Sequence, residues 1–242
     1  MKAVFLTAGD CAMSVQLGDE ISLEVNTRVR MLAHALEEHP IAGVREMVPT
    51  YTTLTIHYHP DVIRAEELKA QVSHRLSSME QLEETKQFVK EIPICYGGEL
   101  GPDLELCAKL EHTSTDEIIR MHASHLYYSY MLGFAPGHAY MARFEEPYHF
   151  KRRDTPRVHI EAGAVVVQQN LSNLIPFEQP CGWNIIGSTP LKVCDYSRKD
   201  PFLVHAGDWV KFIPVSLKEF QQIKALDQKG AYHVKTYERT VK

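Results

Sequence analysis

Histidine is the residue type in this sequence best suited to chemistry near neutral pH, and the chain carries 13 copies of it. An unperturbed imidazole titrates near pH ~6.5, so it can accept and donate protons under ordinary conditions. His122 lies on a predicted helix, where it shares a face with Ile118 and Ile119 and stands three positions before His125. We take His122 as the first candidate for catalytic proton transfer and His138 as the second. A buried, hydrogen-bonded core histidine is the alternative for His122.

His138 belongs to a stretch with unusual backbone demands, which reads GFAPGHAYM over residues 133–141. Two glycines and a proline inside apolar, aromatic sequence indicate a turn with special dihedral angles. Such a turn lets main-chain N–H groups approach a ligand closely, which makes Phe134, Gly137 and Tyr140 candidate substrate-binding residues. The alternative is a tight barrel corner packed on Phe134 and Tyr140.

A second loop, from Gln168 to Asn184, is rich in side-chain amides and contains a Gly-Trp pair. An amide offers both a donor and an acceptor, which suits recognition of small amides or lactams. Gln169, Gly182 and Trp183 are therefore candidate substrate-binding residues, although solvation of the loop explains its amides equally well. We expect this loop and the turn at 133–141 to line one shared pocket.

Metal and disulfide chemistry are not indicated. His57 and His59 share one face of a predicted strand, but no third ligand is evident near them, and two histidines on a wet sheet face are the alternative. The five cysteines are widely spaced and odd in number, without a C-x-x-C pair, which favours reduced thiols. We predict no metal site.

Several standard catalytic centres are missing from the sequence: there is no phosphate-binding P-loop, no dinucleotide-binding glycine motif, no H-E-x-x-H and no G-x-S-x-G. A net charge of −5 disfavours binding of nucleic acid or anionic membrane by bulk electrostatics. No apolar run approaches the roughly 20 residues that span a bilayer, and the first residues do not resemble a signal peptide. We therefore expect a cytoplasmic protein.

Hydrophobic periodicity divides the chain into two predicted domains. Residues 1–92 alternate strands and helices in the order βαββαβ, which predicts a ferredoxin-like domain. Its predicted strands cover 12–17, 43–48, 53–58 and 86–92, and its helices run from about 25 to 36 and 64 to 79.

Residues 93–228 carry a different pattern. Two short helices are predicted, one over 103–110 and one beginning at a capping box formed by Ser114 and Glu117. Beyond Leu126, short apolar runs separated by Gly, Pro and Asn predict a β-rich barrel or sandwich, closed by a strand over 209–215 and a helix from Ser216. Residues 229–242 are predicted to be a polar tail.

A set of short motifs, taken together, resembles the family of 5-oxoprolinase B subunits, also called allophanate hydrolase subunit 1, which includes the Kip inhibitor of a sporulation kinase. The resemblance covers about residues 4–225. The motifs are GD at 9–10 and 18–19, CYGGELGPDL at 95–104, the turn at 133–137, PR at 156–157, GW at 182–183, IG at 186–187, TPL at 189–191 and AGD at 206–208.

The resemblance implies an α+β protein, with a ferredoxin-like N-terminal domain followed by a cyclophilin-like β-barrel domain. It implies a subunit of an ATP-dependent 5-oxoprolinase, a hydrolase that opens 5-oxo-L-proline to L-glutamate. The implied partners are a companion cyclophilin-like subunit, of the type called the 5-oxoprolinase C subunit or allophanate hydrolase subunit 2, and a further 5-oxoprolinase subunit. ATP would bind mainly on or with a partner, and we expect the chain to be inactive alone.

The sequence departs from the family pattern on the predicted ligand face, which leaves the substrate open. One alternative is a subunit of a related amide- or urea-handling complex, of the allophanate hydrolase or carboxyltransferase type. The other is a regulatory module that inhibits a histidine kinase. The departures are His138-Ala139 in place of Phe-Pro, Glu161 in place of Pro, LSNLIP at 171–176, Cys181 in place of Gly, and Ser188 in place of Arg.

Overall fold

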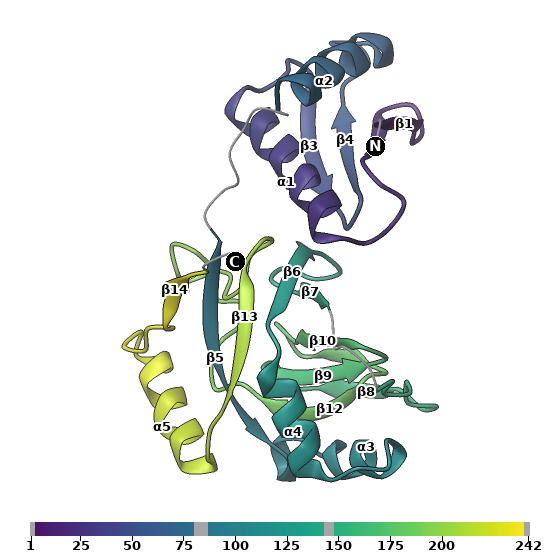
Figure 1. Ribbon diagram of the computed structural model, residues 1–242. Coiled ribbons are helices and arrows are strands. Elements are labelled where there is room, and N and C mark those ends of the chain that lie inside the picture. Colours follow the sequence, from purple (N-terminus) through teal and green to yellow (C-terminus); the bar gives the residue numbers. More distant parts are fainter. Residues whose placement is uncertain (1–2, 80–86, 143–147, 240–242) are drawn as a thin grey trace. The chain divides into compact units, whose positions relative to one another are not determined.

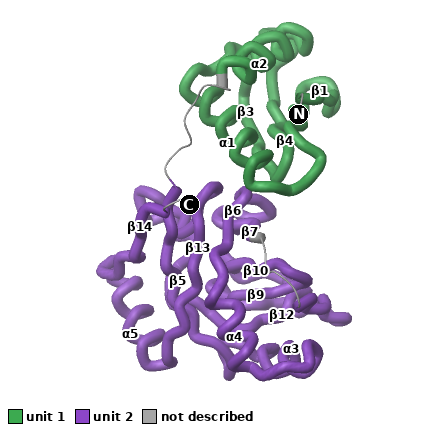
Figure 2. Tube along the Cα trace, viewed as in Figure 1, with its two compact units in different colours: residues 1–85 green, residues 86–242 purple. Residues whose placement is uncertain are grey.

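The computed structural model describes residues 3–79, 87–142 and 148–239, which belong to two compact units, residues 1–85 and 86–242 (Figure 2). None of the helices within these described ranges combines the length and the apolar character needed to cross a membrane.

The first unit is a four-stranded antiparallel sheet with two helices packed against it (Figure 1). The strand order is β1-β2-β4-β3, and the residues alternate along β4, with Leu54, Ile56 and Tyr58 buried. Helix α1 begins where Ser22 accepts a hydrogen bond from Val25 N. The bounds are β1 (Val4–Thr7), β2 (Ala12–Gln16), α1 (Leu23–Glu38), β3 (Val44–Pro49), β4 (Thr53–Tyr58) and α2 (Ala65–Met79).

The element order of this unit differs from the ferredoxin-like order that the sequence predicts. The unit reads ββαββα, and its edge position beside β2 is taken by β1 rather than by a strand that follows α2. The strand expected at 86–92 is β5 (Phe88–Tyr96), which runs parallel to β13 (Trp209–Pro214) in the second unit. A boundary at residue 92 would cut β5, because its buried residues Val89, Ile92 and Ile94 belong to the second unit.

The second unit is built on a closed barrel of seven strands, which confirms the barrel predicted from the sequence. The ring runs β5-β13-β6-β7-β10-β9-β12 and closes by pairing of β12 with β5. The remaining ring strands are β6 (Tyr127–Leu132), β7 (Ala139–Ala142), β9 (Ala164–Gln168), β10 (Leu171–Leu174) and β12 (Asn184–Ser188).

Other elements surround the ring. Strand β14 (Thr236–Glu238) pairs with β5, so the predicted polar tail is in part a sheet strand. Strands β8 (Arg157–Ile160) and β11 (Gln179–Cys181) form a separate two-stranded sheet. The helices are η1 (Gly98–Leu100), α3 (Leu104–Leu110), α4 (Thr115–Ser124) and α5 (Leu217–Gln228).

The barrel wall separates two apolar clusters. The interior holds the large core, in which Val165 and Val167 of β9 are fully buried. Val166, between them, faces the outside and packs with Ile175 in a smaller cluster that also includes Ile185. Successive side chains of a strand point to opposite faces, so β9 and β12 each contribute to both clusters.

Candidate functional site

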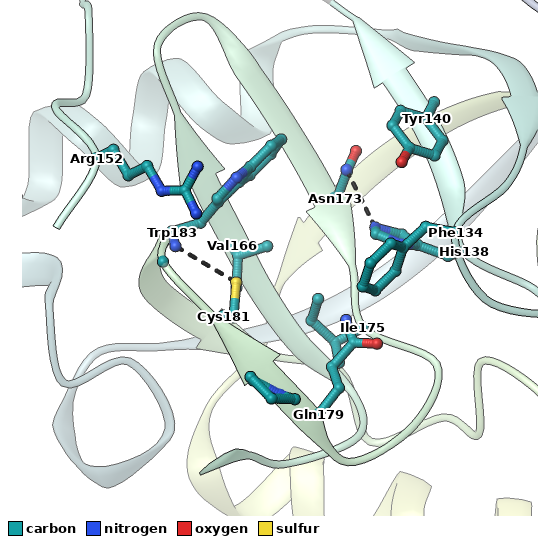
Figure 3. A pocket seen from close by; sticks show the side chains of 12 residues that line it. Phe134, His138, Tyr140, Arg152, Val166, Asn173, Ile175, Gln179, Cys181 and Trp183 are labelled. Atoms are coloured by element: carbon teal, nitrogen blue, oxygen red, sulfur yellow. Dashed lines mark hydrogen bonds between the residues drawn. The ribbon is translucent and has the colours of Figure 1, made fainter. Parts of the chain in front are cut away.

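A cavity of about 190 Å³ lies on the outer face of the barrel wall (Figure 3). The turn at 133–138 and β7 form one side, and the loop at 181–183 forms the other, so the structure brings the two predicted segments together. The described lining residues are Phe134, His138, Tyr140, Arg152, Val166, Asn173, Ile175, Gln179, Pro180, Cys181, Gly182 and Trp183.

The turn at 133–138 contains two residues whose backbone φ angles are positive, in the left-handed region. Phe134 has φ +68° although it carries a side chain, and the residue is 76% exposed beside the cavity. Gly137 has φ +77°, and a Cβ there would lie 3.2 Å from Cys194 Cβ and Phe202 Cδ1. Gly137 lines a second, shallower cavity of about 290 Å³ rather than the first. The N–H groups of Gly133, Ala135 and His138 bond inside the turn, so these three are already paired.

His138 is one of two buried polar residues among the described lining of the cavity, together with Asn173. Its ring stacks on Tyr140 at 5.2 Å between centroids, and 8% of the residue is exposed. Burial lowers the pKa of His138 to about 4, so the ring is neutral at pH 7.

The hydrogen bonds of Asn173 set the tautomer of His138. Two acceptors, Ser172 O and Ala139 O, lie 2.7 and 3.0 Å from one end of the Asn173 amide, against one donor, Met141 N, at 3.3 Å, so we assign that end as the NH₂ group. The carbonyl end accepts a hydrogen bond of 3.2 Å from His138 Nε2. His138 Nδ1 therefore carries a lone pair, and this buried atom has no partner among the described residues. His138 thus lines the cavity and carries a polar atom that is buried and has no partner among the described residues.

The opposite side of the cavity consists of the loop at 181–183. Trp183 N donates to Cys181 Sγ at 3.3 Å, and both side chains pack on the outer apolar cluster. Burial raises the pKa of the Cys181 thiol, which remains protonated at neutral pH. Arg152 lies beside Gly182, with Nε 2.6 Å from where a Cβ of residue 182 would stand.

Asp103 fixes the backbone around this side of the cavity. The residue is 2% exposed, and its carboxylate accepts hydrogen bonds from Arg153 Nη1 at 2.7 Å and from Arg157 Nη1 and Nη2 at 2.6 and 2.8 Å. It also accepts from Ile185 N at 2.8 Å, which ties β12 to the segment that carries Arg152. The sequence does not identify this pairing, because the partners lie 50 and 54 positions from Asp103.

His122 does not line either cavity, which corrects its placement as the first catalytic candidate. It lies inside the barrel with 0% exposure, where Nδ1 is 2.6 Å from Tyr96 OH and Nε2 is 2.8 Å from Ser172 Oγ. Its ring stacks on Phe212 at 4.6 Å, and burial lowers its pKa to about 3. The buried, hydrogen-bonded alternative describes this residue, because the face shared with Ile118 points into the core.

The other predicted residues divide between the cavity and the surface. Phe134, Tyr140, Gly182 and Trp183 line the cavity, whereas Gln169 is exposed, has φ +50° and lies outside it. Sequence reasoning missed Arg152 and Asn173 as site residues. Asn173 lies in the amide-rich loop and Arg152 in a basic run before Pro156-Arg157, which were the available signals.

A different cluster on the surface has metal-ligand chemistry. His159, Glu161 and Glu178 place their ligand atoms within 4.8 Å of one another, and all three are exposed. Both ring nitrogens of His159 already contact carboxylates, at 3.1 Å to Glu161 and 2.8 Å to Glu178. These ion pairs raise the pKa of His159 and account for the cluster without a metal.

Comparison with known proteins identifies relatives of this chain. The family model described as "Carboxyltransferase domain, subdomain C and D" matches residues 3–204. The 5-oxoprolinase B subunit of Bacillus subtilis is 37% identical over 226 residues, covering 89% of this chain and 94% of the relative. The 5-oxoprolinase B subunit of Escherichia coli is 32% identical over 206 residues, covering 85% and 93%.

A solved structure shows a similar fold. The crystal structure of TTHA0988 superposes with a TM-score of 0.75 at 31% identity over 85% of this chain, and the match spans 40% of the TTHA0988 chain. With the family model and the two curated relatives, this likeness shows that the chain belongs to the carboxyltransferase domain family, subdomains C and D, as a relative of proteins named as the B subunit of 5-oxoprolinase.

Proposed function

We propose that this chain is one subunit of an ATP-dependent 5-oxoprolinase, which opens 5-oxo-L-proline to L-glutamate together with partner subunits. The observation that carries the proposal is the identity of 37% with the 5-oxoprolinase B subunit of Bacillus subtilis over 94% of that protein's length. A relationship that spans nearly the whole of both chains supports a common role more strongly than a shared barrel does.

The cavity supports a small cyclic amide as the ligand. Its volume of about 190 Å³ suits a single small ring, and Val166, Ile175 and Trp183 give it apolar walls. We propose that His138 Nδ1, a neutral acceptor, pairs with the N–H of a lactam, which requires the ring to shift because this atom is buried in the structure. A site with a buried acceptor rejects analogues that lack the matching donor, because the acceptor would stay unpaired.

We propose that ATP binds outside this cavity. A triphosphate needs several cationic or N–H donors, and Arg152 is the one lining residue with a permanent positive charge among those the structure describes. We therefore assign ATP to a partner subunit or to a site shared with one. The role derived for this chain is to bind the lactam, orient its N–H toward His138 and shield the ring with Trp183.

The test is co-expression of the chain with its companion cyclophilin-like subunit and the further 5-oxoprolinase subunit, followed by an assay for glutamate release from 5-oxoproline. We expect the purified complex to release glutamate only with ATP, and the isolated chain to release none. His138→Phe in the complex should lower kcat/KM by about tenfold or more, because one buried hydrogen bond to substrate is lost.

Other outcomes would replace the proposal. An intact complex that is inactive on 5-oxoproline but consumes urea with ATP would favour the carboxyltransferase alternative. A chain that does not co-elute with the companion subunits at micromolar concentration, but inhibits a histidine kinase, would favour the regulatory alternative. Robust turnover by the isolated chain would contradict the assignment of ATP to a partner.

A further inference from the structure

We propose that Arg152 anchors a carboxylate group of the ligand, so that the cavity selects small cyclic amides that carry an acid over neutral amides of the same ring. The lactam part of this inference rests on the proposed function. The carboxylate part rests on the position, surroundings and charge of Arg152.

Arg152 is held in place by its neighbours on both sides. Lys151 O accepts a hydrogen bond of 2.8 Å from Asn184 Nδ2, and Arg153 N donates to Gly182 O at 3.0 Å. The Arg153 guanidinium bonds to the buried carboxylate of Asp103. The backbone at residue 152 is therefore fixed against the loop that lines the cavity, which reduces the entropy lost when a ligand binds.

Gly182 makes room for the guanidinium. A Cβ on residue 182 would lie 2.6 Å from Arg152 Nε and 3.0 Å from Nη2, so any larger residue would displace the head group. Figure 3 shows Arg152 and Trp183 on one side of the cavity, with His138 and Tyr140 on the other.

The charge of Arg152 is available to a ligand. The neighbouring arginines, Arg153 and Arg157, both bond to Asp103, whereas no described residue forms an ion pair or hydrogen bond with the Arg152 side chain. The lining residues that the structure describes include no acidic side chain. An arginine binds a carboxylate through two parallel N–H bonds, which fixes the orientation of the acid as well as attracting it.

The two sides of the cavity are therefore complementary to the two ends of one small molecule. In this proposal His138, which Asn173 orients, meets the amide end, and Arg152 meets the acid end. A cyclic amide with a carboxylate on the ring satisfies both, while a plain lactam leaves Arg152 unpaired and a plain ring acid leaves His138 unpaired.

Calorimetric titration of the full chain tests the assignment with three probes: 5-oxoproline, 2-pyrrolidinone, which lacks the acid, and cyclopentanecarboxylate, which lacks the amide. We expect Arg152→Gln to weaken 5-oxoproline and cyclopentanecarboxylate by about 10- to 100-fold, the range for a charge-assisted hydrogen bond, and 2-pyrrolidinone by less than twofold. Lys151→Gln is the control, because it removes a charge from the same segment while its exposed side chain pairs with Asp154.

A second variant moves the guanidinium without removing its charge. Gly182→Ala should weaken the two acids and spare 2-pyrrolidinone, and the fold should survive because a flexible arginine side chain can shift. Three results would overturn the proposal. The two acids could bind Arg152→Gln as tightly as the original chain, or Lys151→Gln could weaken their binding as much as Arg152→Gln does. The third result is that neither acid binds the original chain.

The two proposals fail separately. If the chain binds cyclopentanecarboxylate through Arg152 but its complex does not turn over 5-oxoproline, the carboxylate anchor is supported and the 5-oxoprolinase function is contradicted. If the complex turns over 5-oxoproline and Arg152→Gln leaves kcat/KM unchanged, the 5-oxoprolinase function is supported and the carboxylate anchor is contradicted.

Discussion

Ser172 and Asn173 are adjacent on β10, yet their side chains serve opposite faces of the barrel wall. Ser172 Oγ lies 2.8 Å from His122 Nε2 in the interior, while the Asn173 amide bonds to His138 at the outer cavity. The registers agree, because Ser172 pairs with the inward Val167 and Asn173 with the outward Val166. A buried polar contact inside the barrel thus fixes the strand that positions the outer site.

Removing the Ser172 hydroxyl should destabilise the protein. Ser172→Ala leaves a buried nitrogen of His122 without its partner, so we expect the free energy of unfolding to fall by about 1–3 kcal/mol. Urea denaturation measures the change. Ser129→Ala is the matched control, since the Ser129 hydroxyl is equally buried but has no partner among the described residues, and it should cost much less. Equal losses in the two variants would show that the contact with His122 contributes nothing.

Neutralising Asp103 should have a larger effect. Asp103→Asn leaves two partly buried arginines without their carboxylate, and we expect a loss of about 3–5 kcal/mol of unfolding free energy. Asp154→Asn, in an exposed pair with Lys151, should change it by less than about 1 kcal/mol. The denaturant midpoints of the two variants measure these changes. If Asp103→Asn lowers the unfolding free energy by less than about 1 kcal/mol, other contacts hold the segment at 151–157.

Stability should fall on acidification through the histidine range. The pKa values of His122 and His138 are lowered to about 3 and about 4, so below pH ~6.5 the unfolded chain takes up protons that the folded chain does not. The loss begins near pH ~6.5 and grows as the pH falls toward ~4, reaching on the order of 2 kcal/mol per histidine. Unfolding free energies measured between about pH 4.5 and 8 should show this dependence on pH. The slope should be shallower in His138→Phe. It should be unchanged in the control His74→Gln, which alters an exposed residue of α2. A slope that is the same in His138→Phe as in the original chain would contradict the lowered pKa of His138, whatever the opposite contributions of His159 and His205, whose pKa values are raised.

Replacing His138 separates a packing role from a ligand role. Phe fits beside Tyr140, so His138→Phe should keep the melting temperature within a few degrees and reduce the response to lactams while sparing apolar rings. Thermal denaturation with lactams, ureas and amides provides the measurement. If every ligand response is unchanged and the melting temperature falls by several degrees, His138 is a packing residue.

Fragment expression tests where the second unit begins. We expect residues 86–242 to fold cooperatively and residues 93–242 not to, because the shorter fragment loses Val89 and Ile92 and four of the six residue pairs between β5 and β13. Circular dichroism with thermal melts distinguishes them, and a folded shorter fragment would show that the barrel closes without the start of β5.

Local patterns predict much of this fold. The alternation of Leu54 and Ile56 identifies β4, and Ser114 caps α4 as its spacing with Glu117 suggests. The local sequence of β5 does not predict which of the two units the strand belongs to, because an apolar strand does not specify which of two sheets it joins.

The site was predicted in part for the same physical reason. The turn at 133–141 and Trp183 carry strong local signals, and both reach the cavity. Arg152 and Asn173 reach it through strand register and through the contacts of Asp103, which depend on residues distant in sequence. His122 looked chemically active because of its type, while its burial depends on which helix face meets the core.

The location of the cavity on the outside of the wall has a consequence for how the protein can diverge. Inward residues of β9 and β10 are constrained by the packed lumen, whereas outward residues face only the cavity and a small cluster. If the cavity binds the ligand as proposed, exchanging an outward side chain, or the residues at 152 and 181, should alter ligand choice with little disturbance of the lumen. Specificity and stability would then depend on alternating but separable positions of the same strands.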